Sequence, residues 1–528
     1  MSVPWLSPEG RNLDRPRAAE PLRHPRLLAE TGPTATSGQR AKRAGRPRPL
    51  RPAISICWLM ALSSFATALA VAADLQDWDP PGISVFPDHD AAVTGATPLG
   101  TFIAEGRQLF VTQLNIKDGA GRPTATGDSK PTLRARGENP VFQRLAGPDA
   151  NSCAGCHNQP ATGGSGDFAA NVFVGAHFTD PPTTRIDAKV TNERNTISVF
   201  GSGVIEMVAR EMTDELQMRR KQAQLDAVAT GRPVRVALSA KGVRFGHLVA
   251  QPDGTYDTAG VEGVDIDLVV KPFGVKGVAV SLREFTNFAL NQHHGIQSVE
   301  RFGWARTGVS DFDGDGVEAE FSMGQVSALT VFQATLPVPV RQGPGNPGDL
   351  AVARLGEQRF REIGCAACHV PALPLRSLWF FEPSPYNRPG SAVPADVPGQ
   401  IAAPFHVADD TGLYRDAEGT LLVAAFTDLK RHVICDDEDP HFCNERIRQD
   451  FVPTNQFLTA KLWDAGSSAP YGHRGDLTTL SEAIVHHSGE ATQAKRGFLR
   501  LPDAEKVAII AFLRTLRVSD KPASHTWR

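Results

Sequence analysis

Two short stretches decide how this chain must fold, Cys153-Ala154-Gly155-Cys156-His157 and Cys365-Ala366-Ala367-Cys368-His369. Both have the form Cys-x-x-Cys-His. Two thiols one helical turn apart can form thioethers with the vinyl groups of a haem, while the adjacent imidazole ligates its iron. A zinc site would need a second nearby cysteine pair, and a dithiol redox centre does not require the trailing histidine. The spacing therefore predicts two covalently bound haem c groups, one at each motif.

The length of the chain and the distance between the motifs predict two haem domains. The chain has 528 residues, and the two motifs begin 212 residues apart, which leaves enough sequence for one core around each. The Pro- and Gly-rich stretch 337–347 is the best boundary. We therefore expect an N-terminal haem c domain over residues 74–340 and a C-terminal one over residues 341–528. The expected fold is mainly α, with two cytochrome c-like haem domains, long loops and a small β insertion in the first domain.

Residues 1–73 predict export. The first 51 residues form a basic leader rich in Arg and Pro, and an apolar segment follows over residues 53–73. Small residues before Ala73 and polar sequence directly after it are typical of a signal peptide, with a retained membrane anchor as the alternative. We expect a periplasmic protein, because haem is attached to such motifs outside the cytoplasm.

The charge of the chain argues against nucleic-acid binding. Removing residues 1–73 takes away 11 basic and 4 acidic side chains, which leaves a formal charge of −10. A strongly acidic protein repels the phosphate backbone of DNA and RNA. We therefore expect no nucleic-acid partner.

Two cysteines remain outside the motifs and the signal segment, Cys435 and Cys443. An oxidising compartment would allow them to pair. A disulfide that closes this short loop is favoured over a metal site formed with His432 and His441.

The helix before each motif is predicted to be duplicated. The sequence Glu105–Phe110 resembles Leu355–Phe360, and in both a Gly is followed four residues later by Phe. The second motif begins five residues after Phe360, whereas the first copy inserts about forty residues rich in Gly, Pro and Thr. This insert is expected to be a loop near the first haem.

Hydrophobic periodicity predicts further elements between and after the motifs. A long helix is expected over residues 204–229 and a small β insertion over residues 233–271. A helix through residues 282–290 ends at His293-His294, and a counterpart through residues 479–485 ends at His486-His487. In each helix a Leu and a terminal His fall on one face, which predicts equivalent positions for His293 and His487.

The sequence Asp311-Phe312-Asp313-Gly314-Asp315-Gly316 has the alternating carboxylates and turn glycine of a calcium loop. Ser322 occupies the position where a bidentate Glu would complete an EF-hand, and Glu318 or Glu320 could substitute for it. The stretch therefore predicts either a calcium site with Asp311, Asp313 and Asp315 as ligands or an acidic turn.

Several stretches together carry a family resemblance: Cys153–Pro160, Gly201–Glu206, Asn291–Gly295, Phe426–His432, and Ala469–His473 followed by Thr479–Ala491. The chain resembles the di-haem oxidoreductase family of putative peroxidases, which is related to the bacterial di-haem cytochrome c peroxidases and the methylamine-utilisation di-haem enzyme. These stretches span nearly all of the chain after residue 73.

The resemblance implies that the first haem meets peroxide and that the second haem feeds it electrons. In the peroxidases the second haem takes a Met as its far ligand, in the helix after an Ala-Pro-Tyr-x-His stretch. At the matching position this chain has His487, so His369 and His487 are the expected axial pair. Two imidazoles give a lower reduction potential than His and Met, because thioether sulfur favours reduced iron. The family's Trp between the haems has no clear match, and Trp304 is the candidate.

Peroxide reduction also needs a group that moves a proton beside an open position at one haem. Such a group transfers the proton from the near to the far oxygen as the O–O bond breaks. The pseudo-repeat predicts this chemistry at the iron held by His157, with candidates drawn from His293, His294, Glu206 and Glu211, each of which could equally have a structural role.

Three functions remain open: a periplasmic peroxidase, an oxygen-using or substrate-modifying di-haem enzyme, like the rubber oxygenases or the methylamine-utilisation enzyme, and a non-catalytic electron-transfer cytochrome. An open or displaceable sixth position at the first haem would favour the enzymes, and two six-coordinate haems would favour the carrier. The expected partners are hydrogen peroxide or another small oxidant, and a small electron-donor protein such as a monohaem cytochrome or a cupredoxin.

Overall fold

The computed structural model describes residues 79–121, 149–167, 169–173, 191–344, 346–407, 413–445 and 447–518. These residues belong to one compact unit, Trp78–Arg528. The predicted signal peptide and most of the predicted loop before the first motif lie outside them. Within the described ranges, no helix is both long and apolar enough to span a bilayer.

A pair of packed helices lies beside the first motif. Helix α3 (Leu99–Val111) packs against α9 (Met323–Ala334) and contacts α4 (Cys153–Cys156), the short helix of the motif itself. The close approach of the two long helices depends on Gly106, because a Cβ there would lie 2.0 Å from the carbonyl oxygen of Ala328.

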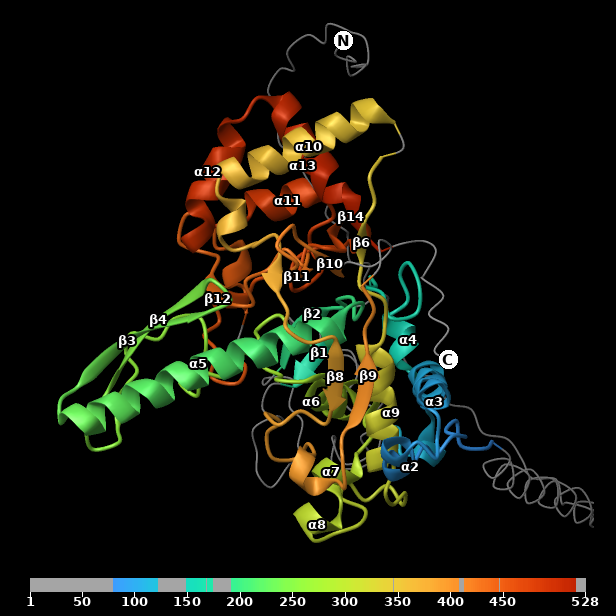
Figure 1. The fold of residues 1–528 in the computed structure, drawn as a ribbon. Helices are drawn as coiled ribbons and strands as arrows, with labels where there is room; N and C mark the ends of the chain where they lie inside the picture. The colour runs from blue at the N-terminus through green and yellow to red at the C-terminus, as the bar shows by residue number, and fades with distance from the viewer. Residues whose placement is uncertain are drawn as a thin grey trace, which may run out of the picture. The chain divides into compact units, whose positions relative to one another are not determined.

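A second pair repeats this arrangement at the second motif. Helix α10 (Pro347–Glu362) packs against α13 (Asp503–Thr515), and the two lie side by side (Figure 1). Helix α10 also contacts η4 (Cys365–Ala367), the turn of the motif. Gly356 allows the contact between the long helices, because a Cβ there would lie 1.9 Å from the carbonyl oxygen of Ala508.

The predicted duplication of the helix before each motif is confirmed. Four residues after each glycine, an aromatic ring packs near the histidine of the motif. The ring centres of Phe110 and His157 are 6.2 Å apart, and those of Phe360 and His369 are also 6.2 Å apart. One helical turn separates each Gly from its Phe, so one face of the helix contacts both the partner helix and the motif.

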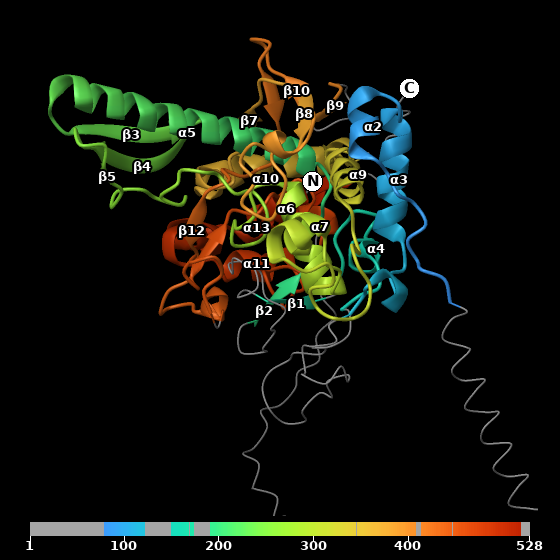
Figure 2. The ribbon, with the colours of Figure 1, turned by 90° about the horizontal axis from the view of Figure 1, so that it is seen from below.

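The predicted long helix is α5 (Ser202–Thr230), and an antiparallel sheet of β3 (Val234–Ala240), β4 (Val243–Ala250) and β5 (Tyr256–Asp257) packs along it (Figure 2). The β insertion is therefore present. Its predicted last strand is wrong, because residues 264–270 form turns in which Leu268 has a φ of 60°. The signal came from alternating apolar residues, but in the part of the chain that the structure describes no strand pairs with residues 264–270.

The helices predicted to end at histidine pairs are found. Helix α6 (Leu282–Ala289) continues into the π-helical turn η3 (Leu290–His294). Helix α11 (Leu480–Val485) ends directly before His486. The other helices and helical turns are α2 (His89–Thr94), η1 (Ile116–Asp118), α7 (Val299–Phe302), α8 (Trp304–Thr307), η5 (Pro394–Asp396), η6 (His441–Cys443), η7 (Ala465–Ser467), η8 (Gly489–Ala491) and α12 (Thr492–Arg500).

The prediction of a mainly α fold with two cytochrome c-like haem domains is wrong. Helices take up 38% of the described residues and strands 15%, in several small antiparallel sheets. Beyond those of the β insertion, the strands are β1 (Ala169–Phe173), β2 (Thr191–Asn195), β6 (Val340–Arg341), β7 (Leu373–Pro374), β8 (Trp379–Glu382), β9 (Ile401–Pro404), β10 (Leu413–Arg415), β11 (Leu421–Val423), β12 (Arg431–Val433), β13 (Gln456–Leu458) and β14 (Leu516–Arg517). Most have two to four residues, too few to give a period-two pattern, and their pairing is set by distant partners.

The hydrophobic core extends across the predicted boundary at residue 340. The largest cluster joins Phe102 and Val204 from the first part of the chain to Phe380 and Val423, which follow the second motif. A smaller cluster around the second motif includes Phe360, Phe426, Phe498 and Phe512. Each motif thus has apolar surroundings, and the division into haem domains over residues 74–340 and 341–528 stays a prediction.

We predict that Gly356→Ala lowers the free energy of unfolding by about 1–3 kcal/mol, because the added methyl group collides with the Ala508 carbonyl. Gly348→Ala is the matched control, since it lies in the same helix and a Cβ there would meet only Asn346 Oδ1, at 3.4 Å. Thermal unfolding followed by circular dichroism measures both. Equal midpoints for the two variants would contradict the helix contact.

Candidate haem sites

The first motif presents His157 with one ring nitrogen already engaged. Ser152 caps α4, because its hydroxyl accepts a hydrogen bond from Gly155 N at 3.1 Å. His157 Nδ1 lies 3.2 Å from the carbonyl oxygen of Gly164. A carbonyl oxygen can only accept, so Nδ1 carries the hydrogen and Nε2 keeps a free lone pair. Burial lowers the pKa of His157 to about 4, so the ring is neutral and able to ligate a metal.

The histidine of the second motif makes the same kind of hydrogen bond to a backbone carbonyl. His369 Nδ1 lies 3.1 Å from the carbonyl oxygen of Phe426, which again leaves Nε2 free. Burial, with His487 as the next cause, lowers the pKa of His369 to about 4. Metal-bound histidines in proteins are commonly held in this way, because the second hydrogen bond fixes both the tautomer and the ring orientation.

His487 faces His369 at a distance that fits a shared metal ion. Its Nδ1 lies 2.6 Å from the carbonyl oxygen of Ala483, and burial lowers its pKa. The ring centres of His369 and His487 are 6.4 Å apart. Two imidazole nitrogens that each lie about 2.0 Å from one ion place their ring centres roughly 6 Å apart. The pair therefore fits bis-imidazole ligation of a haem iron. His486 turns away and stacks on His441 with ring centres 4.2 Å apart.

His294 and His293 are brought to the first motif. His294 is buried, and its Nδ1 lies 2.7 Å from the carbonyl oxygen of Ala150. Its Nε2 is 3.8 Å from Cys153 Sγ. His293 Nδ1 lies 3.2 Å from a carboxylate oxygen of Asp149. Burial is the largest cause that lowers the pKa of His157, and a nearby His293 lowers it further.

Comparison with known protein families finds a match in the segment that follows the second motif. Residues 421–516 match the family model described as "Di-haem oxidoreductase, putative peroxidase". The resemblance to the di-haem oxidoreductases is confirmed over this segment. It contains His487 but neither Cys-x-x-Cys-His motif. A search of curated proteins finds no match to the chain. The family description supports an oxidoreductase that uses haem.

The thiols of three motif cysteines are shielded from water. Burial raises the pKa of Cys153 to about 12, that of Cys156 to about 11 and that of Cys365 to about 12. Without a metal ion these environments favour the uncharged thiol, and a thioether to haem is likewise uncharged.

One further group near the second motif has the composition of a metal site, Cys368 with Asp428 and His432. The two ring nitrogens of His432 lie 2.8 Å from Asp428 Oδ2 and 2.7 Å from Glu490 Oε2. Burial by itself would lower the pKa of His432. The hydrogen bonds of its ring, above all the one to Asp428, outweigh burial and raise this pKa to about 11. Both ring nitrogens of His432 are thus engaged by carboxylates, which is the arrangement of an ion network.

Glu206 is held in a buried ion network. Its carboxylate pairs with Arg210 and accepts a hydrogen bond from Leu282 N at 2.7 Å. Among the hydrogen bonds and ion pairs of the described residues, none joins it to the first motif. Glu211 likewise pairs with Lys241 and accepts the N–H of Arg376. The structure thus gathers His293 and His294 at the motif, and the catalytic role of Glu206 stays a prediction.

The Trp candidate from the sequence lies at the surface, and a different Trp is buried. Trp304 is 69% exposed on α8. Trp463 is 2% exposed, and its indole packs on Gly201 at the start of α5. Sequence inspection missed Trp463 because nothing local distinguishes it from a core residue. Its neighbour Leu462 packs against the hydrophobic cluster around the second motif.

The favoured disulfide is confirmed, since Cys435 and Cys443 are bonded.

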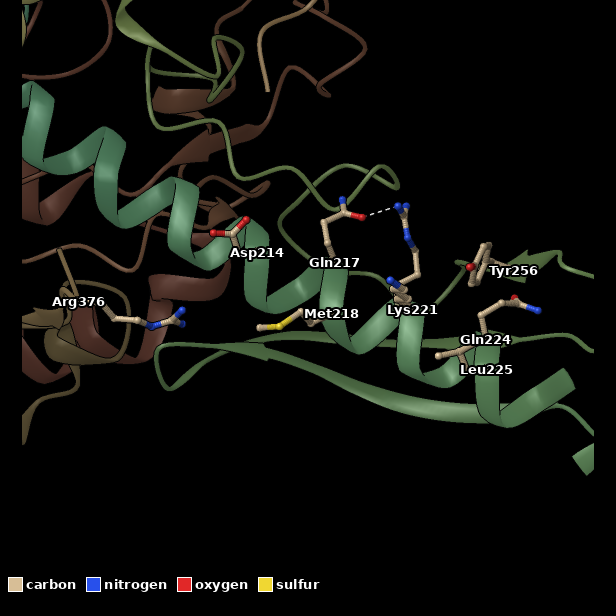
Figure 3. Close-up of a pocket in the computed structure, with 9 residues that line it drawn as sticks. Asp214, Gln217, Met218, Lys221, Gln224, Leu225, Tyr256 and Arg376 are labelled. Atoms are coloured by element: carbon tan, nitrogen blue, oxygen red, sulfur yellow. Dashed lines mark hydrogen bonds between the residues drawn. The ribbon is translucent and has the colours of Figure 1, made fainter. Parts of the chain in front are cut away.

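A surface pocket on α5 and β5 is lined by residues such as Met218, Lys221, Tyr256 and Arg376 (Figure 3). None of the residues predicted to bind haem or to act in catalysis lines it. The pocket therefore does not belong to the candidate haem sites.

We predict that Glu206→Gln changes how stability depends on pH. Burial, opposed by Arg210, raises the pKa of Glu206 from 4.5 to about 7. The folded chain therefore holds this proton more tightly than the unfolded chain, and the parent loses stability as pH rises from about 4.5 to about 7. Gln has no such proton, so the variant should gain on the parent by roughly 1.4 kcal/mol per unit of raised pKa. Urea unfolding at pH 4.5 and pH 8 checks it, and a pH-independent difference would contradict it.

Proposed function

We propose that this chain is an exported, periplasmic di-haem c-type oxidoreductase that reduces hydrogen peroxide with electrons passed from the second haem to the first. The observation that carries the proposal is the set of three partly buried histidines, His157, His369 and His487, each with Nδ1 hydrogen-bonded to a backbone carbonyl, which leaves the ring lone pair on Nε2. Such preparation is typical of metal-bound imidazole. Cys153, Cys156, Cys365 and Cys368 would hold the two haems covalently.

Two bound haems would supply two one-electron centres, and reduction of one hydrogen peroxide to two waters consumes two electrons and two protons. The chain's own residues then have to position peroxide and move protons. His293 suits the proton transfer, because Asp149 engages its Nδ1 and leaves Nε2 to take a proton from one peroxide oxygen and return it to the other.

His294 decides between two functions. Its Nδ1 is bonded to a backbone carbonyl in the same way as in the three predicted ligands. As a displaceable or nearby group it supports the peroxidase. As a permanent sixth ligand it supports the second candidate function, an electron-transfer cytochrome whose two irons are both fully ligated.

A connection between the two sites supports electron transfer within one chain. Leu462 belongs to the cluster around the second motif, whereas its neighbour Trp463 belongs to the large core. Trp463 contacts Gly201, and Val199 N donates to the carbonyl of Gly163, beside the Gly164 that holds His157. We propose this segment as the electron route.

Export is supported by chemistry outside the motifs. Disulfides such as Cys435–Cys443 form and persist in oxidising compartments, of which the periplasm is one. A small electron-donor protein, such as a monohaem cytochrome or a cupredoxin, would supply the second haem in that compartment.

We predict that His293→Gln, in protein produced with haem attachment, retains both haems but slows the reaction with peroxide on the order of 10²-fold, the usual loss for an acid/base group. His294→Ala should also retain both haems. Its peroxide reaction should accelerate if His294 ligates the iron, because a blocking group is removed. Stopped-flow absorbance after mixing with peroxide measures the rates, and a haemochrome assay measures haem content.

His247→Gln, on β4, is the control and should match the parent. Rates within about twofold of the parent for both His293→Gln and His294→Ala would overturn the assignment of this site. A parent protein that holds two six-coordinate haems and ignores peroxide, even after reduction of one haem, would favour the electron carrier.

We predict that His487→Met raises the reduction potential of the second haem and introduces a sulfur-to-iron charge-transfer band, because thioether sulfur favours reduced iron. Redox titration followed by absorbance tests this. His486→Met should leave that haem unchanged, since His486 stacks on His441. An unaltered spectrum for His487→Met would rule out the axial pair.

A further inference from the structure

One stretch of chain, residues 426–439, lies against the segments of both predicted ligands of the second haem. At its start, the carbonyl oxygen of Phe426 lies 3.1 Å from His369 Nδ1. Further along, β12 contacts η8, the turn that begins two residues after His487. Because one stretch meets both segments, its attachment around His487 contributes to the distance between the two imidazoles.

The backbone directly after His487 is fixed to this stretch. Ser488 N donates a hydrogen bond to the carbonyl oxygen of Ile434 at 3.0 Å. Gly489 packs on the same stretch, because a Cβ there would lie 2.5 Å from the carbonyl oxygen of Val433. Ser488 is 2% exposed, so water would not replace a partner that is lost at this contact.

Asp436 is the side chain that joins the two segments. Its Oδ2 accepts hydrogen bonds from Ser488 Oγ at 2.5 Å, Gly489 N at 2.9 Å and Thr492 Oγ1 at 3.3 Å. The Ser488 hydroxyl first, and the Gly489 N–H next, hold the pKa of Asp436 below its usual value. The carboxylate is therefore charged at neutral pH, and hydrogen bonds to a charged acceptor are roughly twice as strong as those between neutral groups.

The second oxygen of Asp436 fixes the loop that carries it. Oδ1 accepts hydrogen bonds from Glu438 N and Asp439 N, each at 3.0 Å. The Cys435–Cys443 disulfide closes the same loop, and its first cysteine directly precedes Asp436. A crosslink over so short a separation limits the conformations of the residues it encloses. The carboxylate is thus presented to the segment after His487 in one direction.

The same loop also holds the residue before His487. Asp439 Oδ1 lies 3.2 Å from His486 Nδ1, and Asp439 Oδ2 accepts a hydrogen bond from Lys495 Nζ at 2.6 Å. His486 and Ser488, the two neighbours of His487 in the chain, are therefore both engaged by carboxylates of one loop.

We propose that Asp436 is a positioning residue of the second haem site, which holds His487 in the axial position through Ser488. The Cys435–Cys443 disulfide keeps Asp436 in place for this role. The proposal rests on the proposed function only in that His487 ligates the second iron. Asp436 acts through the backbone and contacts neither haem nor peroxide in this role. Its loss should leave both haems attached and make His487 easier to displace.

The test is displacement of His487 by cyanide in the full chain with both haems attached and oxidised. The imidazole has to leave the iron before cyanide binds, so the rate reports how firmly His487 is held. Electron paramagnetic resonance of samples frozen at successive times follows the loss of the bis-imidazole signal. The signal that is absent from His487→Met identifies the second haem.

We expect Asp436→Asn to accelerate this displacement on the order of tenfold or more, the usual effect of losing an outer partner of a metal ligand. Asn cannot replace the carboxylate, because one of the two accepting oxygens becomes an NH₂ group. Joint replacement of both loop cysteines, Cys435→Ser with Cys443→Ser, should also accelerate it. Asp437→Asn, an exposed acid of the same loop, is the matched control and should behave as the parent.

Hydrogen exchange shows whether the attachment itself is broken. The Gly489 amide should exchange faster in Asp436→Asn than in the parent, because its acceptor is lost. Faster exchange with an unchanged rate of displacement, or equal results for the parent and Asp436→Asn in both measurements, would overturn the role of Asp436. If Asp436→Asn does not fold, Ser488→Ala removes one donor and should accelerate displacement about fivefold, the usual size for one hydrogen bond. A parental rate in Ser488→Ala would then refute the proposal.

The reference variant separates this proposal from the proposed function. If His487→Met loses no signal, His487 is not a ligand, and the axial pair of the proposed function is wrong. If that signal is lost in His487→Met but its displacement by cyanide is unchanged in Asp436→Asn, only the positioning role is wrong.

Discussion

The hydrogen bond from a histidine Nδ1–H to a backbone carbonyl is the interaction on which the arrangement of both motifs depends. It occurs at His157, His369 and His487, and the acceptors belong to Gly164, Phe426 and Ala483. A buried neutral imidazole needs its N–H satisfied, and a carbonyl can do this in only one tautomer. The fold thereby orients the lone pairs of three imidazoles by means of backbone acceptors.

Long helices pack closely beside each motif. Gly106 and Gly356 let α3 and α10 approach α9 and α13 until backbone meets backbone. Overpacking such a contact costs more than a surface change, so the spacing between helix and motif is strongly specified. The repeat is therefore one of packing geometry, and it does not extend to the strands that surround each motif.

The sequence was informative where a pattern is local and repeated. The helices that became α5, α6 and α11 follow from periodicity, and the pairing of Cys435 with Cys443 follows from proximity and compartment. The fold class was wrong because most strands after the second motif are too short to carry a pattern. The same lack of local signal hid Trp463, whose burial results from contact with Gly201, 262 residues earlier in the chain.

By itself, the sequence determined the chemistry available: two Cys-x-x-Cys-His motifs, histidine pairs at helix ends and an acidic loop, since covalent spacing fixes which groups one turn can present together. Only the tertiary structure decided which of these groups meet. It set His487 opposite His369, brought His294 to Cys153 and paired Glu206 with Arg210. These contacts join residues from different elements, or choose among neighbours on one helix, and burial selects them through the cost of leaving a polar group without a partner.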